Sequence, residues 1–168
     1  MSYQEKKTMV TMASQILILI VYLFYVFNQL QGTPLLANDL LFWARTILFF
    51  LIIGVVTTIV ILIAFHIYLS VAIAVKENRA GNQVDGDQIE KTLELDMVED
   101  EMDNLISLKA VRFGYAFSGF GFLAAVIAVV LGATPAVMIN IIYLSFTFGS
   151  ILEGMVQLYF YRRGVTNG

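Results

Sequence analysis

Cysteine is absent from this chain, and charged residues are scarce. Without cysteine the chain can form no disulfide, no thiolate metal site and no cysteine nucleophile. Charged residues make up 14% of the 168 residues, against about 25% in ordinary soluble domains. Only one histidine is present. The sequence therefore offers few groups for metal or proton chemistry, and its composition is not that of a soluble domain.

Charge is missing altogether from three long stretches, residues 9–30, 46–75 and 113–134. A fourth stretch, residues 136–161, contains a single charged residue, Glu153. About 20 apolar residues in helical form cross the hydrocarbon core of a bilayer. Each stretch reaches that length, and the sequence therefore predicts four membrane-spanning helices.

The predicted fold is all-α, an integral membrane four-helix bundle formed by one domain over residues 1–168. Only residues 76–112 lie between spans in any number, and this segment is too short to bury a core of its own. The second apolar stretch has 30 residues, about 45 Å at a rise of about 1.5 Å per residue. We therefore expect a long second helix that either tilts or emerges from the bilayer.

The distribution of basic residues predicts the orientation. Nine of the ten Lys and Arg residues fall at the two termini or in residues 76–112, and only Arg45 falls on the other side of the spans. Cytoplasmic loops carry the excess of Lys and Arg in membrane proteins. We expect a multi-pass protein of the cell (inner) membrane, with both termini and the 76–112 segment in the cytoplasm and the lipid bilayer as its first partner.

Small residues recur along the third span at heptad spacing, alternately four and three positions apart. The series is Gly114, Ser118, Gly121, Ala125, Ala128 and Gly132. Small side chains let helix backbones approach closely, which drives association in lipid. This face is either an internal packing seam or the contact between two copies in a homo-oligomer.

Glu153 is the only ionisable acid inside a span, and such a group is costly in hydrocarbon. A tight corner at residues 132–135 makes the third and fourth spans an antiparallel hairpin. The register that we expect places Gly114 opposite Gly154, Ser118 opposite Ser150 and Tyr115 opposite Glu153. Glu153 then either contacts Tyr115 or Arg112 and locks the two spans together, or forms a proton or cation site.

His66, the only histidine, falls near the inner interface when residues are counted inward from Arg45. That depth argues against a proton relay at the midplane. We expect an interfacial hydrogen bond.

Residues 76–112 contain an amphipathic pattern. Asp87 is a plausible helix cap, and Ile89, Leu93 and Met97 begin an apolar stripe. We expect a cytoplasmic helix from about Asp87 into the third span near Lys109. Four carboxylates share another face of it: Asp96, Glu99, Asp100 and Asp103. They form a solvated face, a docking site for a basic cytoplasmic protein, or a divalent metal site, although no calcium-loop spacing is present.

Two motifs carry a resemblance. Residues 98–115 combine an acidic stretch, Leu-Ile, Lys-Ala-x-Arg and an aromatic position that opens a span, and residues 157–165 combine aromatics, paired Arg and Gly. This C-terminal half resembles a family of small, uncharacterised prokaryotic four-helix membrane proteins. The resemblance implies the same fold and assigns no catalytic or ligand residue.

The sequence lacks the residues that several classes of protein function require. No Asp lies within a span, no Gly-x-Ser-x-Gly motif is present, and neither a phosphate-binding glycine loop nor a basic-aromatic nucleic-acid surface occurs. We expect no enzyme, no cofactor, no metal and no nucleic-acid partner. The sequence favours a membrane interaction or regulatory protein that presents its acidic helix to a partner or to another copy. The alternative is a small oligomeric transporter or channel with Glu153 in the pathway.

Overall fold

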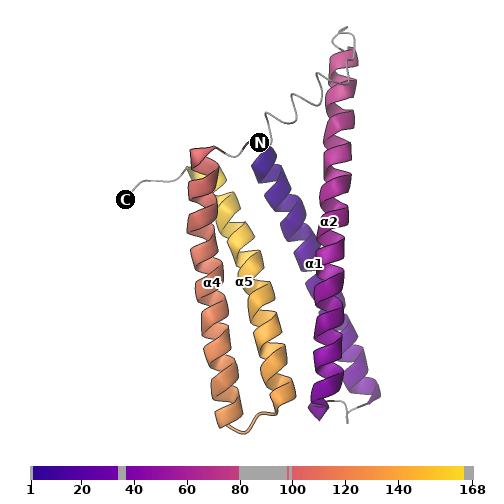
Figure 1. Cartoon of the computed structure of the whole chain (residues 1–168), viewed down its shortest axis with the longest axis vertical. Coiled ribbons are helices and arrows are strands. Elements are labelled where there is room, and N and C mark those ends of the chain that lie inside the picture. Colours follow the sequence, from indigo (N-terminus) through magenta and orange to yellow (C-terminus); the bar gives the residue numbers. More distant parts are fainter. Residues whose placement is uncertain (1, 34–36, 80–97, 99, 165–168) are drawn as a thin grey trace.

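A computed structural model describes residues 2–33, 37–79, 98 and 100–164. Over these residues the chain is helical and contains no strand, as predicted (Figure 1). The helices are α1 (Tyr3–Gly32), α2 (Leu40–Arg79), α4 (Glu101–Val130) and α5 (Pro135–Arg163). All four are long and apolar enough to cross a membrane.

Each helix begins at a polar residue whose side chain accepts a hydrogen bond from the first turn. Ser2 Oγ accepts from the amide of Glu5, and Asp39 Oδ1 accepts from the amide of Phe42. Thr134 caps α5 in the same way, with Pro135 in the first turn. Caps satisfy amides that a helix cannot satisfy itself. The cap at Asp39 explains why α2 begins ahead of the uncharged stretch at residue 46.

The start of α4 corrects one prediction. Asp100 has an extended backbone, and it forms a reciprocal capping box with Asp103. The amide of Asp103 donates to Asp100 Oδ1 at 2.7 Å, and the amide of Asp100 donates to Asp103 Oδ2 at 3.2 Å. The prediction of a single helix from about Asp87 to Lys109 is therefore wrong, because α4 begins at this capping box. Asp87 itself lies outside the described residues.

The four helices run side by side, and both chain termini lie at one end of the molecule (Figure 1). We call this the terminal end, and the opposite end, which carries the α1–α2 and α4–α5 connections, the hairpin end. α4 packs mainly on α5, α5 packs on α1, and α1 packs on α2, which also reaches α5. The molecule thus consists of two helical hairpins joined chiefly through α1 and α5.

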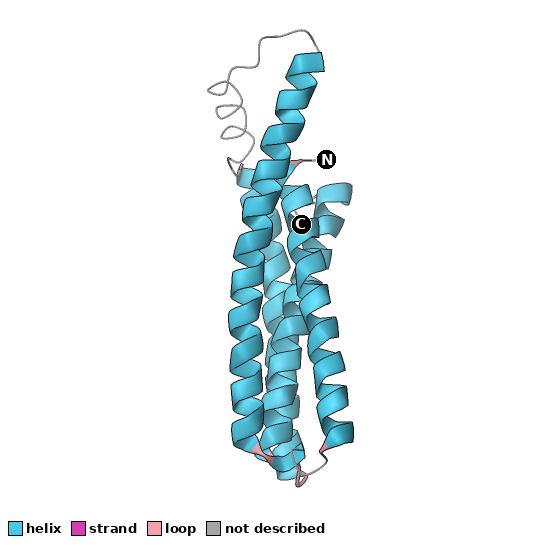
Figure 2. Cartoon of the chain, turned by 90° about the vertical axis from the view of Figure 1, so that its right-hand side faces the viewer, coloured by secondary structure: helices cyan, strands magenta, loops and turns pink. Residues whose placement is uncertain are grey.

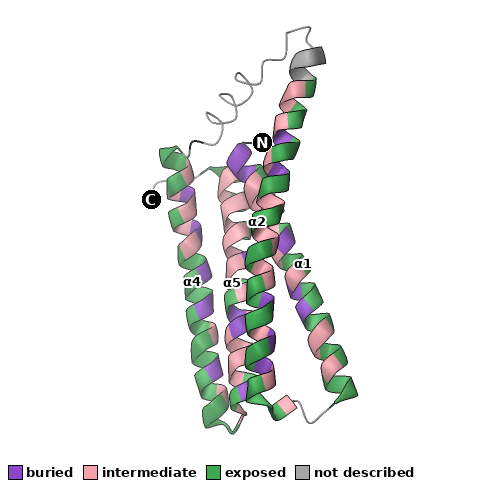
Figure 3. Cartoon of the chain, turned by 45° about the vertical axis from the view of Figure 1, so that its right-hand side comes forward, coloured by how far each residue is buried: buried purple, intermediate pink, exposed green. Residues whose placement is uncertain are grey.

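The contact between α4 and α5 is the closest in the structure. Gly114, Ser118 and Ala125 are buried on the side of α4 that faces α5 (Figure 3). A Cβ atom added to Gly114 would lie 3.0 Å from the carbonyl oxygen of Gly149, and one added to Gly121 would collide with the Ser145 side chain. The first four small residues of the heptad series therefore lie in a seam within one chain.

The last two members of that series lie elsewhere. Ala128 is half-buried, and its carbonyl accepts from the amide of Ala133 at 2.9 Å. Gly132 forms the turn with a φ of 96°, and its amide donates to the carbonyl of Val129 at 3.0 Å. This pair of bonds is a Schellman motif, which favours glycine at the left-handed position. Gly132 thus serves the turn and not the seam.

The observed register differs from the expected one. Gly114 packs between Gly149 and Glu153, and the Ser118 hydroxyl donates to the Ser145 carbonyl at 3.4 Å. Gly154 packs instead against Met12 of α1, where an added Cβ would lie 3.3 Å from the Met12 Cβ. The register differs from the predicted one because the small residues of α5 face two neighbouring helices, α4 and α1.

Apolar side chains cover most of the outer surface, and polar ones are found inside. Ser14, Ser118 and Ser145 are buried, whereas Phe120, Leu131 and Phe24 are among the most exposed side chains. Exposed apolar side chains are unfavourable in water and favourable in contact with hydrocarbon. This surface is compatible with a multi-pass membrane protein.

α2 extends beyond the other helices at the terminal end (Figure 2). Leu69 of α2 packs with Phe65 and Tyr3 at the start of α1. Ten more residues follow to Arg79, about 15 Å at a rise of about 1.5 Å per residue. This projection, residues 70–79, carries exposed Val71 and Val75.

Gly121→Val should destabilise the α4–α5 seam. Overpacking a close contact costs about 1–3 kcal/mol, and the added side chain would collide with Ser145. We expect a lower midpoint of thermal unfolding in detergent. Gly119→Val is the matched control, since a Cβ at Gly119 meets no atom within 4 Å. Equal midpoints for the two variants would contradict the seam.

Candidate functional site: a polar cleft between α1, α4 and α5

Polar side chains join α1 to α5 along most of their length. Thr8 donates to Gln157 Oε1 at 3.0 Å, Gln15 Nε2 donates to Ser150 Oγ at 2.8 Å, and the Tyr22 hydroxyl donates to Asn140 Oδ1. The three α1 residues are seven positions apart, so they lie on one face of the helix. We call these three pairs the α1–α5 ladder.

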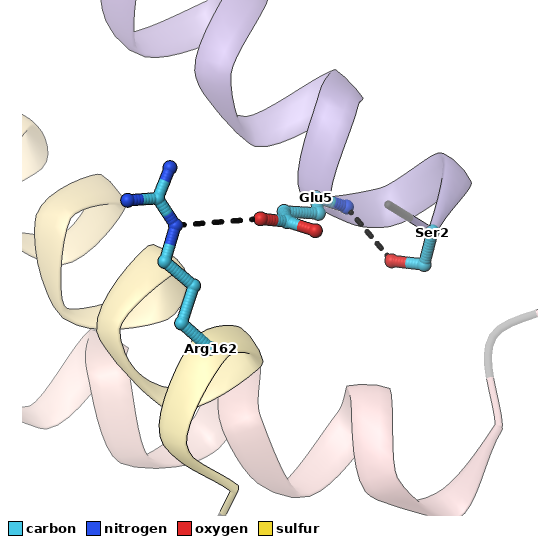
Figure 4. Close-up of polar contacts among 3 residues, drawn as sticks. All are labelled: Ser2, Glu5 and Arg162. Atoms are coloured by element: carbon cyan, nitrogen blue, oxygen red, sulfur yellow. Dashed lines mark hydrogen bonds and ion pairs between the residues drawn. The ribbon is translucent and has the colours of Figure 1, made fainter.

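An ion pair continues the ladder at the terminal end. Glu5 Oε1 lies 3.6 Å from Arg162 Nε, and the Glu5 amide donates to Ser2 Oγ (Figure 4). The Glu5 side chain is 12% exposed and that of Arg162 is 66% exposed. The first turn of α1 and the last turn of α5 are thereby held together.

Beside the ladder lies a cavity of about 220 Å³, which we call the polar cleft. Side chains from three helices line it: Gln4, Lys7, Thr8, Thr11, Met12 and Gln15 of α1, Asp103 and Ser107 of α4, and Ser150, Glu153, Gly154, Gln157 and Tyr161 of α5. The cleft extends from the Gln15–Ser150 pair, near the middle of both helices, to the terminal end. Polar lining at that depth is unusual, because hydrocarbon penalises polar groups.

Glu153 lies in the wall of this cleft. Gln157 Nε2, one turn away on α5, donates to Glu153 Oε1 at 3.3 Å. Gly114 of α4 lies against the other carboxylate oxygen, since a Cβ there would be 3.3 Å from Glu153 Oε2. No ion pair joins Glu153 to a basic side chain among the residues that the structure describes. Its carboxylate is held in place by a neutral amide.

The two predicted partners of Glu153 lie elsewhere. Tyr115 is 71% exposed and Arg112 is exposed, so both side chains lie on the outer side of α4. The predicted Tyr115 and Arg112 contacts are therefore wrong. Gly114 occupies the position facing Glu153, and the next residue along a helix is rotated by about 100° away from it.

The structure describes two of the four acidic residues of the predicted carboxylate face, Asp100 and Asp103. Asp100 and Asp103 bind each other's backbone amides in the capping box, and Asp103 also lines the polar cleft. Asp96 and Glu99 lie outside the described residues. A continuous face required a helix through Asp100, and the backbone there is extended.

His66 lies at the terminal end of the α1–α2 contact. Its Nε2 lies 2.9 Å from the Tyr3 hydroxyl, and its ring meets the Tyr3 ring edge-on. This hydrogen bond joins α1 to α2, and the predicted position of His66 at the inner membrane interface stays a prediction. His66 lies away from the polar cleft, whose lining comes from α1, α4 and α5.

A cluster of buried aromatic rings lies beyond the cleft. Tyr22, Phe50 and Tyr143 form a buried cluster toward the hairpin end, with the Tyr22 and Tyr143 ring centroids 4.5 Å apart. The cleft itself ends on that side at Gln15 and Ser150, which are the residues of its lining nearest the hairpin end.

Sequence reasoning missed the contribution of α1. The stretch from residue 9 to 30 was interpreted as apolar alone, although Thr8, Gln15 and Tyr22 recur every seven residues. A matching series exists in α5, where Gln157, Ser150 and Tyr143 are also seven apart. Two polar heptads of equal period in an antiparallel pair of helices are a readable signal for this interface.

Comparisons with protein-family models, curated proteins and solved structures find no match. Among the described residues no group of three His, Cys, Asp or Glu side chains could hold a metal ion. The cleft lining contains two carboxylates, Glu153 and Asp103, and one ammonium group, Lys7, among neutral hydroxyl and amide groups. A carboxylate in a low-dielectric surrounding attracts a proton or another small cation.

A double-mutant cycle should detect the ladder. Gln15→Leu and Ser150→Ala each remove one partner of the 2.8 Å bond, and the coupling energy between them should be about 0.6 kcal/mol and no more than about 1.7 kcal/mol. Reversible unfolding in mixed detergent micelles gives the four free energies. Gln15→Leu with Ser145→Ala is the control, because the Ser145 hydroxyl donates within α5 to Ile141. Coupling as large in the control pair would argue against the ladder.

Proposed function

We propose that this protein is a small membrane transport protein that takes up a small organic cation, an ammonium compound, at Glu153. One observation carries the proposal: the Glu153 carboxylate lines a polar cavity in a helix that is long and apolar enough to span a membrane, with a neutral amide as its hydrogen-bond partner. A carboxylate retained at such cost is by default functional.

The size of the cleft supports an organic cation. Drug-sized ligands occupy pockets of about 300–1,000 Å³, whereas a bare metal ion needs far less than the 220 Å³ found here. Hydroxyl and amide groups from Thr8, Gln15 and Gln157 can orient a small ammonium group beside the carboxylate. Two carboxylates, Glu153 and Asp103, and one ammonium, Lys7, give the lining a net negative charge.

The arrangement of the helices supports transport by movement of one hairpin against the other. α4 and α5 form one unit through their glycine seam, and α1 joins that unit through separate polar pairs. The lining of the cleft runs from Gln4 and Asp103 at the terminal end to the Gln15–Ser150 pair, and a buried aromatic cluster lies toward the hairpin end. Many transporters expose a central site alternately to the two sides by rocking of such units.

We place the terminal end in the cytoplasm, because nine of the ten basic residues belong to the termini or to residues 76–112. The membrane is then the cell (inner) membrane, and the cleft loads from the cytoplasmic side. No step of the proposal requires a cofactor or covalent chemistry, so the protein is proposed not to be an enzyme.

Glu153→Gln should abolish uptake of tetramethylammonium into proteoliposomes, since it keeps the side-chain shape and removes the charge. The probe is permanently charged and crosses bare lipid slowly. Uptake by the variant should fall to the level of empty liposomes, while its thermal midpoint shows that the fold is intact. Glu101→Gln, an exposed acid in the first turn of α4, should transport like the wild type. Undiminished uptake by Glu153→Gln would refute the proposal.

A second candidate function, interaction with a partner or another copy, is favoured by the projection of α2. Ile73 still packs against the cluster of Tyr3, Phe65 and Leu69, whereas Val71 is 55% exposed and Val75 is 46% exposed. Apolar side chains exposed at this end would be covered in an assembly.

The double variant Val71→Asn and Val75→Asn should reduce chemically cross-linked adducts of the protein in native membranes, because it makes the projection polar. Val71→Leu with Val75→Leu keeps the surface apolar and should preserve them. An unchanged adduct pattern in the Asn variant would remove this candidate.

A further inference from the structure

A second, larger hollow lies beside the polar cleft. It has a volume of about 500 Å³ and is formed by α2 and α5, with Gln15 and Ile18 of α1 contributing to its wall. We call it the lateral groove. Val55, Ile59 and Phe146 line it and are each more than half exposed, so the groove opens on the outer surface of the helices.

The lining of the lateral groove is apolar and aromatic. Phe50, Tyr143 and Phe146 contribute rings, and Val55 and Ile59 contribute aliphatic side chains. The groove also contains two threonines, but Thr58 donates to the Gly54 carbonyl at 2.8 Å and Thr147 donates to the Tyr143 carbonyl at 2.9 Å. Because these hydroxyls are satisfied within their own helices, the groove presents a surface suited to an apolar ligand.

The groove and the cleft share a wall. Gln15 and Ser150 line both hollows, and the 2.8 Å hydrogen bond between them is part of that wall. Glu153 lies one turn from Ser150 on the side of the cleft. A ligand that replaced this single hydrogen bond would therefore reach from the outer apolar surface to the carboxylate.

We propose that the two hollows form one site for an amphiphilic cation, with its charged group beside Glu153 and its apolar body in the lateral groove. This inference rests on the proposed function and names its substrate class. The groove falls within the volume of about 300–1,000 Å³ that drug-sized ligands occupy. Aromatic faces such as those of Phe50 and Tyr143 also attract organic cations.

The charge of the cleft distinguishes this occupant from membrane phospholipid. A phospholipid headgroup carries a phosphate, which the carboxylates of Glu153 and Asp103 would repel. A lipophilic ammonium or phosphonium compound carries no negative group. The substrate class is thus hydrophobic organic cations.

Gly54 provides the test of the groove. A Cβ at Gly54 would meet only Ile18 Cδ1, at 4.0 Å, so a larger side chain fits the backbone and fills the groove. Gly54→Phe should weaken binding of tetraphenylphosphonium to protein in lipid nanodiscs by about tenfold or more. The same variant should take up tetramethylammonium like the wild type, because the polar cleft is unchanged.

Two controls make the outcome decisive. Gly119→Phe adds the same side chain on exposed α4, away from the groove, and should bind tetraphenylphosphonium like the wild type. Glu153→Gln should lose both tetraphenylphosphonium binding and tetramethylammonium uptake.

Undiminished tetraphenylphosphonium binding by Gly54→Phe would overturn the proposal that the lateral groove holds the apolar body of the ligand. It would leave the transport proposal in place. Equally strong binding of the anion tetraphenylborate to the wild type would also overturn the proposed site, since the Glu153 carboxylate would then not select for positive charge. Failure of the wild type to take up tetramethylammonium would instead count against the proposed function itself.

Discussion

Helices that are long and apolar enough to cross a membrane would meet there a hydrocarbon core that offers no hydrogen-bond partners. Inside a bilayer an unpaired amide or hydroxyl has no water to bond with, so each polar side chain must find a protein partner. Thr8, Gln15 and Tyr22 find theirs on α5, and the buried serines bond to backbone carbonyls of their own helices. The relative position of α1 and α5 follows from this requirement more than from shape.

The two contacts made by α5 differ in kind, and this difference organises the molecule. Toward α4 it presents Gly149 and Ser145, and the backbones approach closely. Toward α1 it presents Asn140, Ser150 and Gln157, and the helices meet through side-chain hydrogen bonds. Glu153 lies at the boundary between the two faces, touching Gly114 of α4 and the cavity shared with α1.

The features that could be predicted from the sequence are those that depend on a single helix. The absence of charge over residues 9–30, 46–75 and 113–134 is a property of single helices, and it correctly predicted an all-helical chain with four helices apolar enough for a membrane. The surroundings of Glu153 depend on the rotation and register of three helices at once. Tyr115 and Gly114 are neighbours in sequence, yet one is exposed and the other faces the carboxylate. The start of α4 could not be predicted in this way, because it depends on the extended backbone of Asp100, where a regular helical pattern of side chains continues in the sequence.

The pairing of α1 with α5 also has a consequence for biosynthesis. Thr8 and Gln157 are 149 positions apart, and Gln15 and Ser150 are 135 apart. At translation rates of about 5–20 residues per second, the first helix waits roughly 7–30 s before its mate is made. During that interval Thr8 and Gln15 cannot form these two bonds. The α1–α5 ladder is therefore completed only when the last helix has been made.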